Sequence, residues 1–153
     1  MKLGEAVKIL VSIALAAFMF GGCATTPIRS VDAIRVPNER LFAFQEMTAT
    51  ATAKIVVTRD VGLLGSGCYV GLGINKVHAA RLDVGETSNF YVEPGEVLLS
   101  LGVDPLGVGL CFSAGNTKVL VTREIYIRSG EEKLYRIVSL PAGTIDIIRS
   151  EVE

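Results

Sequence analysis

Few residues of this chain belong to the types that carry metal or redox chemistry, and their spacing supports neither. The chain has one histidine, His78, and three cysteines, Cys23, Cys68 and Cys111, with no CxxC pair among them. A structural zinc site needs several Cys or His ligands at short, regular spacing. We therefore expect no metal and no cofactor, and we interpret His78 as a structural or solvent-facing residue.

Nucleophilic and acid–base catalysis are also poorly supported. Around Ser113 the chain reads Cys-Phe-Ser-Ala-Gly, so Cys111 stands where the G-x-S-x-G elbow requires glycine. The carboxylates Asp60, Glu86 and Asp104 are candidates for acid–base work, but their spacing indicates no shared cleft. We therefore expect a protein that is not an enzyme and has no catalytic residues.

The chemistry of Cys23 depends on the segment before it. Residues 9–20 form an apolar run interrupted only by Ser12, after a short charged stretch. As a helix this run would span about 18 Å, which is too short for the roughly 30 Å of hydrocarbon in a bilayer. The run is typical of an export signal. The sequence Phe-Gly-Gly-Cys at 20–23 resembles a bacterial lipobox, whose cysteine is acylated and becomes the first residue after cleavage.

We therefore predict a lipoprotein signal peptide over residues 1–22, cleavage between Gly22 and Cys23, and lipidation of Cys23. Phe20 departs from the aliphatic residue usual at that lipobox position. An ordinary secretory signal cut near Gly22 or Ala24, and an uncleaved anchor, remain alternatives. Ala24 after the cysteine favours the outer membrane of a Gram-negative cell, with the protein in the inner leaflet facing the periplasm.

Export also bears on the other two cysteines. An oxidising periplasm favours a disulfide between Cys68 and Cys111, which would contribute about 4 kcal/mol in the chain-entropy model. Each cysteine precedes an aromatic residue and follows a glycine-rich stretch, which would suit similar positions in a sheet. Two separate buried thiols are the alternative.

The remaining sequence predicts one all-β domain, an antiparallel β-sandwich of about eight or nine short strands over residues 39–153. Runs rich in β-branched residues alternate with turn residues roughly every eight to twelve positions, which is typical of a sandwich or barrel. Residues 23–38, with two prolines and little periodicity, are interpreted as the lipidated cysteine and a tether. We expect strands at 53–59, 68–74, 77–82, 89–92, 97–101, 109–113, 118–127, 133–140 and 144–149.

Charge and glycine content narrow the expected partners. The net charge is −1 and the longest run of like charge is Glu131-Glu132, so the sequence has no basic patch of the kind that binds nucleic acid.

Eleven glycines fall between Gly62 and Gly115. Glycine within strands marks bulges, corners or close backbone approach. These glycines therefore indicate either a sharply coiled sheet or a recognition surface.

Several short motifs in order carry a family resemblance. They are Val57-Thr58-Arg59-Asp60, Gly65-Ser66-Gly67-Cys68, Ile74-Asn75-Lys76, Gly85-Glu86 and Pro94-Gly95-Glu96. With the lipobox they resemble small proteobacterial lipoproteins of unknown function and, more distantly, PEGA-type and DUF2846-type β-sandwich modules. Asn75-Lys76 stands where such modules often have Asn-Gly or Asp-Gly, which leaves the turn type open. The resemblance implies a compact sandwich in the cell envelope and brings no catalytic residues.

The expected function is that of a lipid-anchored, non-enzymatic periplasmic protein that binds an envelope protein or polymer, or supports the envelope structurally. Its expected partners are the membrane, through the lipid, and an envelope protein. A small-ligand carrier with an apolar cavity inside a β-barrel is the first alternative. A hydrolase of envelope polymers, which would have to use Asp60, Glu86 or Asp104, is the less favoured one.

Overall fold

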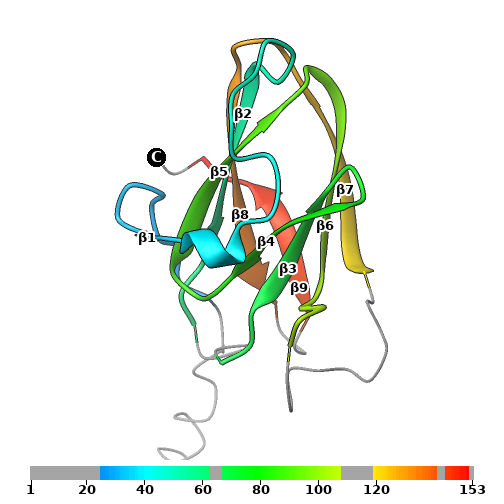
Figure 1. Ribbon diagram of the computed structural model, residues 1–153. Helices are drawn as coiled ribbons and strands as arrows, with labels where there is room; N and C mark the ends of the chain where they lie inside the picture. The colour runs from blue at the N-terminus through cyan, green and yellow to red at the C-terminus, as the bar shows by residue number, and fades with distance from the viewer. Residues whose placement is uncertain (1–24, 63–66, 108–118, 141–143, 152–153) are drawn as a thin grey trace, which may run out of the picture.

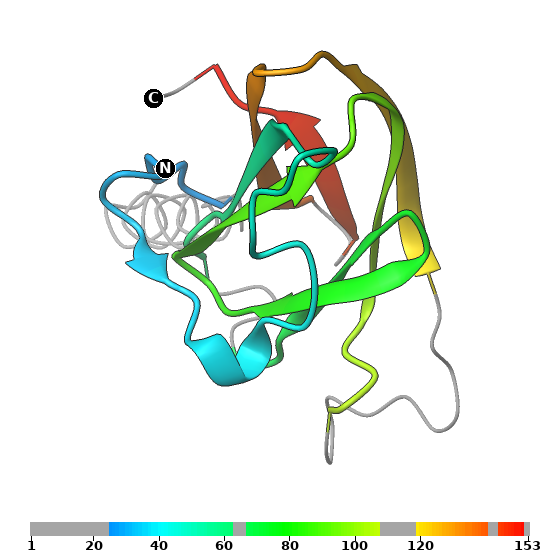
Figure 2. The same cartoon turned by 45° about the horizontal axis from the view of Figure 1, so that its top comes forward.

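A computed structural model describes residues 25–62, 67–107, 119–140 and 144–151 of the chain, and these residues form two β-sheets packed face to face (Figures 1 and 2). The five-stranded sheet has the order β1 (Ile34–Arg35), β5 (Glu86–Val92), β2 (Ala53–Arg59), β8 (Glu132–Ser139) and β9 (Ile145–Arg149). The four-stranded sheet has the order β4 (Val77–Leu82), β3 (Val70–Ile74), β6 (Gly95–Val103) and β7 (Val119–Ile127). The predicted all-β sandwich is confirmed.

Most strand pairs are antiparallel, as predicted, with two exceptions in the five-stranded sheet. β2 pairs with β8 in parallel, and the short β1 pairs with β5 in parallel. The first parallel pair arises because the chain crosses from β7 in one sheet to β8 in the other, so that β8 enters beside β2. Strands β2 and β4 have the predicted bounds, whereas the strand predicted at 109–113 lies outside the described residues.

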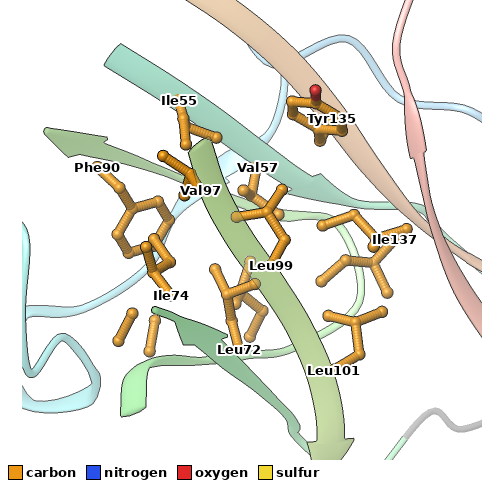
Figure 3. Close-up of a cluster of buried hydrophobic side chains, with 14 of the residues drawn as sticks. Ile55, Val57, Leu72, Ile74, Phe90, Val97, Leu99, Leu101, Tyr135 and Ile137 are labelled. Atoms are coloured by element: carbon orange, nitrogen blue, oxygen red, sulfur yellow. The ribbon is translucent and has the colours of Figure 1, made fainter. Parts of the chain in front are cut away.

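The core lies between the sheets and is filled with aliphatic side chains. Along β6, Val97, Leu99 and Leu101 point inward, because successive side chains of a strand alternate between its faces. They meet inward residues of the opposite sheet, including Ile55 and Phe90 (Figure 3). Full burial of each such side chain contributes about 1.5–3 kcal/mol relative to exposure. Because these residues pack in the core, the residues that alternate with them lie on the outer face of each sheet.

The segment before β2 is held against the domain rather than hanging from it. Thr26 exchanges two backbone hydrogen bonds with Val61, of 2.7 and 3.2 Å. The chain then forms β1 along β5 and buries Val36 in the core. The boundary predicted at residue 39 therefore falls inside the folded part, and the described part of the predicted tether belongs to the domain from Thr26 onward.

The rest of this segment closes one open side of the sandwich. A short 3₁₀ turn, η1 (Asn38–Arg40), leads into an extended stretch whose Phe42 amide donates to the Ala79 carbonyl on β4. Phe44 then accepts a hydrogen bond from the Tyr91 amide on β5. The segment therefore spans both sheets and covers the edge of β4.

The strand directions give the sandwich two distinct ends. β2, β4, β6 and β8 finish at the same end, where the Thr26–Val61 pair lies, and we call it the N-proximal end (Figure 1). The opposite, distal end carries the turns at 75–76, 93–94 and 128–131. No helix within the described ranges is long and apolar enough to cross a membrane.

Candidate functional site

The outer face of the four-stranded sheet is hollowed by a groove of about 550 Å³. Its floor lacks side chains because Gly71 and Gly73 occupy the outward positions of β3, and Gly102 occupies one on β6. A Cβ at Gly73 would lie 2.4 Å from the Ser100 Oγ, so a side chain at this position would clash with β6. Of the two interpretations of the glycines, this local arrangement supports a recognition surface.

The β3–β4 hairpin forms one wall of the groove. Asn75 and Lys76 both have positive φ, 50° and 67°, so the turn that the sequence left open is of type I′. The backbone N–H of Asn75 donates to the Leu98 carbonyl at 2.8 Å, and the Asn75 side-chain Oδ1 accepts from the backbone N–H of Leu98 at 2.9 Å. These bonds fix the hairpin tip on β6 and hold the cationic Lys76 at the rim.

A β-bulge in β4 brings His78 to the groove. Strict alternation predicts that His78 shares a face with Ala80 and Leu82, and this prediction is wrong. The register shifts between Leu72 and Gly73, so Ala79 is an extra residue and both alanines are fully buried. His78 consequently pairs with Gly73 on the outer face, where it lines the groove.

The environment of His78 keeps its ring neutral. The ring stacks on Phe42 with centroids 4.9 Å apart, and Nε2 is buried with no hydrogen-bond partner among the described residues. Burial lowers the pKa of His78 below its ordinary 6.5, an effect that outweighs the raising influence of Asp104. A buried nitrogen without a hydrogen bond reduces the stability of the folded protein. The Nε2 of His78 is therefore an unsatisfied polar atom that lies just beneath the surface of the groove.

Strand β7 forms the other wall and is an edge of its sheet. Thr122 and Val119 line the groove from β7, and both are exposed. Arg123 lies on the opposite face of β7 and donates to the Asp146 carboxylate of β9 at 2.7 Å. That ion pair explains why a charged residue interrupts the otherwise apolar face of this strand.

The three carboxylates considered for catalysis are all engaged by arginines near the N-proximal end. Each accepts two hydrogen bonds from one guanidinium, and each carboxylate-bearing side chain is at most 9% exposed. The pairs are Asp60–Arg136, Glu86–Arg40 and Asp104–Arg81. Hydrogen bonding to the carboxylate raises the pKa of both Arg40 and Arg136. Bidentate pairing of this kind fixes geometry, and it occupies the carboxylate oxygens that acid–base chemistry would need.

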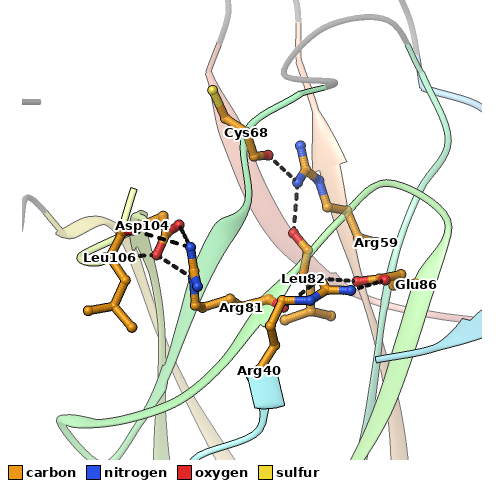
Figure 4. Close-up of polar contacts among 8 residues, drawn as sticks. All are labelled: Arg40, Arg59, Cys68, Arg81, Leu82, Glu86, Asp104 and Leu106. Carbon is orange, nitrogen blue, oxygen red and sulfur yellow. Dashed lines mark hydrogen bonds and ion pairs between the residues drawn. The ribbon is translucent and has the colours of Figure 1, made fainter. Parts of the chain in front are cut away.

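Two of these pairs are linked through Tyr69. The Arg40 and Arg81 guanidinium carbons lie 4.5 and 4.8 Å from its ring centroid, at cation–π distance. The nearly buried Arg59 donates to the carbonyls of Cys68 and Leu82, both at 2.8 Å (Figure 4). Burial lowers the pKa of Arg59. These arginines therefore tie the ends of β2, β3 and β4 together.

The predicted modification sites lie partly beyond the described residues. Gly22, Cys23 and Cys111 are among the residues not described. Cys68 is disulfide-bonded, but its pairing with Cys111 stays a prediction. Mass spectrometry of the unreduced protein tests it: a peptide joining the two cysteines is expected, and alkylated thiols at both would contradict it.

Sequence reasoning missed the groove, although it identified the glycines that form its floor. Their spacing carries the signal, since Gly71 and Gly73 are two residues apart and must share one face of a strand. Comparison of the chain with protein-family models, curated proteins and solved structures gave no match. Within the described ranges, no three His, Cys, Asp or Glu side chains are grouped so as to hold a metal ion.

Proposed function

We propose that this chain is a lipid-anchored, non-enzymatic protein of the bacterial cell envelope that binds a segment of an envelope protein or polymer in the groove. The single observation that carries the binding role is the groove itself. Its mostly apolar surface bears a few separated polar groups, namely Lys76, His78, Ser100 and Thr122. That combination is typical of binding sites, where apolar area contributes affinity and a few polar atoms set orientation.

The groove is open along the sheet rather than enclosed, which suits an extended segment of a larger partner. Binding in the core would need a cavity between the sheets, but aliphatic side chains of the described strands fill that space. This observation favours groove binding over the alternative of a ligand inside a barrel. The arginine pairing of Asp60, Glu86 and Asp104 likewise favours a non-enzymatic role over the hydrolase.

The envelope address rests on the lipobox at 20–23, on the preceding apolar run and on the resemblance to small proteobacterial lipoproteins. Globomycin, which blocks lipoprotein signal peptidase, is expected to accumulate the unprocessed precursor. The Cys23→Ala variant cannot be acylated, so the same peptidase should leave it uncleaved and it should accumulate as the unprocessed precursor. Normal processing with globomycin, together with normal processing of the variant, would contradict the anchor.

Binding in the groove is tested by site-specific photocrosslinking in intact cells. A benzophenone amino acid is placed at Thr122 in the groove, and in the control at Ile148, an exposed residue of β9 in the other sheet. We expect one discrete adduct from position 122 and none from position 148. The adduct should disappear when Leu98→Trp fills the groove. Equal labelling from both positions, or an adduct that survives this filling, would contradict the proposed site.

A further inference from the structure

The length of chain between the proposed lipid and the fold is very short. This inference rests on the proposed lipidation of Cys23. Only Ala24 and Thr25 separate that cysteine from Thr26, which is already hydrogen-bonded to Val61. Three residue steps span about 10 Å at full extension. An acylated Cys23 must therefore hold the N-proximal end of the sandwich within about a nanometre of the bilayer.

The surface of that end suits contact with lipid. Large apolar side chains are exposed just beyond the strand ends there: Val61 after β2 is 37% exposed, Leu106 after β6 56% and Leu140 after β8 40%. Each follows a different strand, so the three do not form one continuous segment of chain. Exposed apolar groups of this kind bind the boundary between lipid headgroups and acyl chains.

The charges at this end are also arranged for contact with a low-dielectric surface. The carboxylates of Asp60, Glu86 and Asp104 are buried and paired with arginines. An unpaired carboxylate would be repelled by anionic lipids and would lose hydration there. Because each of these three carboxylates has a bonded positive partner, none of the three brings an unpaired charge to the bilayer.

We propose that the N-proximal end docks on the bilayer surface, with Leu106, Leu140 and Val61 in contact with the headgroup boundary. The lipid then fixes the orientation of the domain as well as its location. The distal turns point away from the membrane, and the groove, on the outer face of the four-stranded sheet, stays open at the side.

The chain contains no tryptophan, so a single introduced tryptophan reports its own surroundings. The probe variants are Leu106→Trp and Leu140→Trp. The matched control is Met47→Trp, at a 64% exposed residue of the distal end. Each full-length lipidated protein is purified from membranes, incorporated into phosphatidylethanolamine–phosphatidylglycerol vesicles and checked by flotation. Its fluorescence is then compared in vesicles with and without brominated acyl chains, which quench tryptophan on contact.

We expect at least twofold quenching and a blue-shifted emission for Leu106→Trp and Leu140→Trp, and less than a tenth of that quenching for Met47→Trp. Floating protein with equal quenching at both ends, or none at residues 106 and 140, would overturn the docking and leave the anchor standing. Failure of wild-type protein to float would refute the anchor and the docking together. If Leu106→Trp alters the far-ultraviolet circular dichroism, Leu140→Trp decides the result.

Discussion

The groove and the ion-paired N-proximal end both carry polar side chains, but the two regions satisfy them in opposite ways. At the N-proximal end every buried carboxylate accepts two hydrogen bonds from one arginine. In the groove, the His78 Nε2 is buried with no partner among the described residues, and the Thr122 hydroxyl stands on an exposed strand. Buried polar groups in folded proteins are normally paired in this way. In the groove, the exposed Thr122 can bind a ligand directly, whereas the buried Nε2 becomes available only if the His78 ring moves.

Breaking one ion pair should give the largest effect. In Arg136→Ala the Asp60 carboxylate, on a residue only 1% exposed, loses its charged partner. Removing one member of a buried pair costs about 3–5 kcal/mol of unfolding free energy, and urea denaturation measures that loss. Asp146→Ala is the control, because the Arg123 side chain of that pair is 50% exposed and such pairs contribute about 0–1 kcal/mol. Equal losses in both variants would contradict the assigned structural role.

A substitution in the groove floor should reduce the stability of the protein by a smaller amount, and a second substitution should restore it. Gly73→Ala places a Cβ 2.4 Å from the Ser100 Oγ, which can move only by rotating its side chain. We expect a loss of about 1–3 kcal/mol, the usual cost of overpacking. Ser100→Ala in the same chain removes the hydroxyl and should restore most of it. A double variant no more stable than Gly73→Ala would show that the close contact is not the cause.

How far the sequence predicted this molecule depended on whether the signal was local. Strands at 53–59 and 77–82 were predicted with the bounds observed, because alternation and turn residues act within a few positions. The ion pairs could not be predicted in this way. Asp60 and Arg136 are 76 residues apart and meet only because β8 pairs in parallel beside β2.

Two other features had local signals that favoured the wrong interpretation. The prolines of the first segment resembled a linker, yet Val36, directly before the second of them, is buried in the core. The bulge in β4 could not be located because Ala79 and Ala80 are equally small, and either fits the interior. A one-residue shift reverses the face of every preceding side chain in the strand. His78 was therefore assigned to the wrong face for a reason that composition does not reveal.

The smallest effect is a pH dependence that comes from the groove alone. Burial lowers the pKa of His78 below 6.5 in the folded protein, so the unfolded chain binds the proton more tightly. The contribution of neutral His78 to the free energy of unfolding is therefore fully present above pH 6.5. It is lost as the pH falls through 6.5 toward the lower pKa of the folded protein. The loss is at most about 1.4 kcal/mol for each unit by which the two pKa values differ. His78→Phe should remove this part of the slope in urea melts between about pH 7 and pH 5, whereas carboxylate titrations at lower pH persist in both proteins.

A ligand that hydrogen-bonds the neutral Nε2 should also bind more weakly over that range, but the ion-paired end should show no corresponding change, because its arginines stay charged throughout. An unchanged slope in His78→Phe would mean that the ring is better hydrated than its burial implies, and the contrast between an unsatisfied groove and a satisfied end would lose its principal residue.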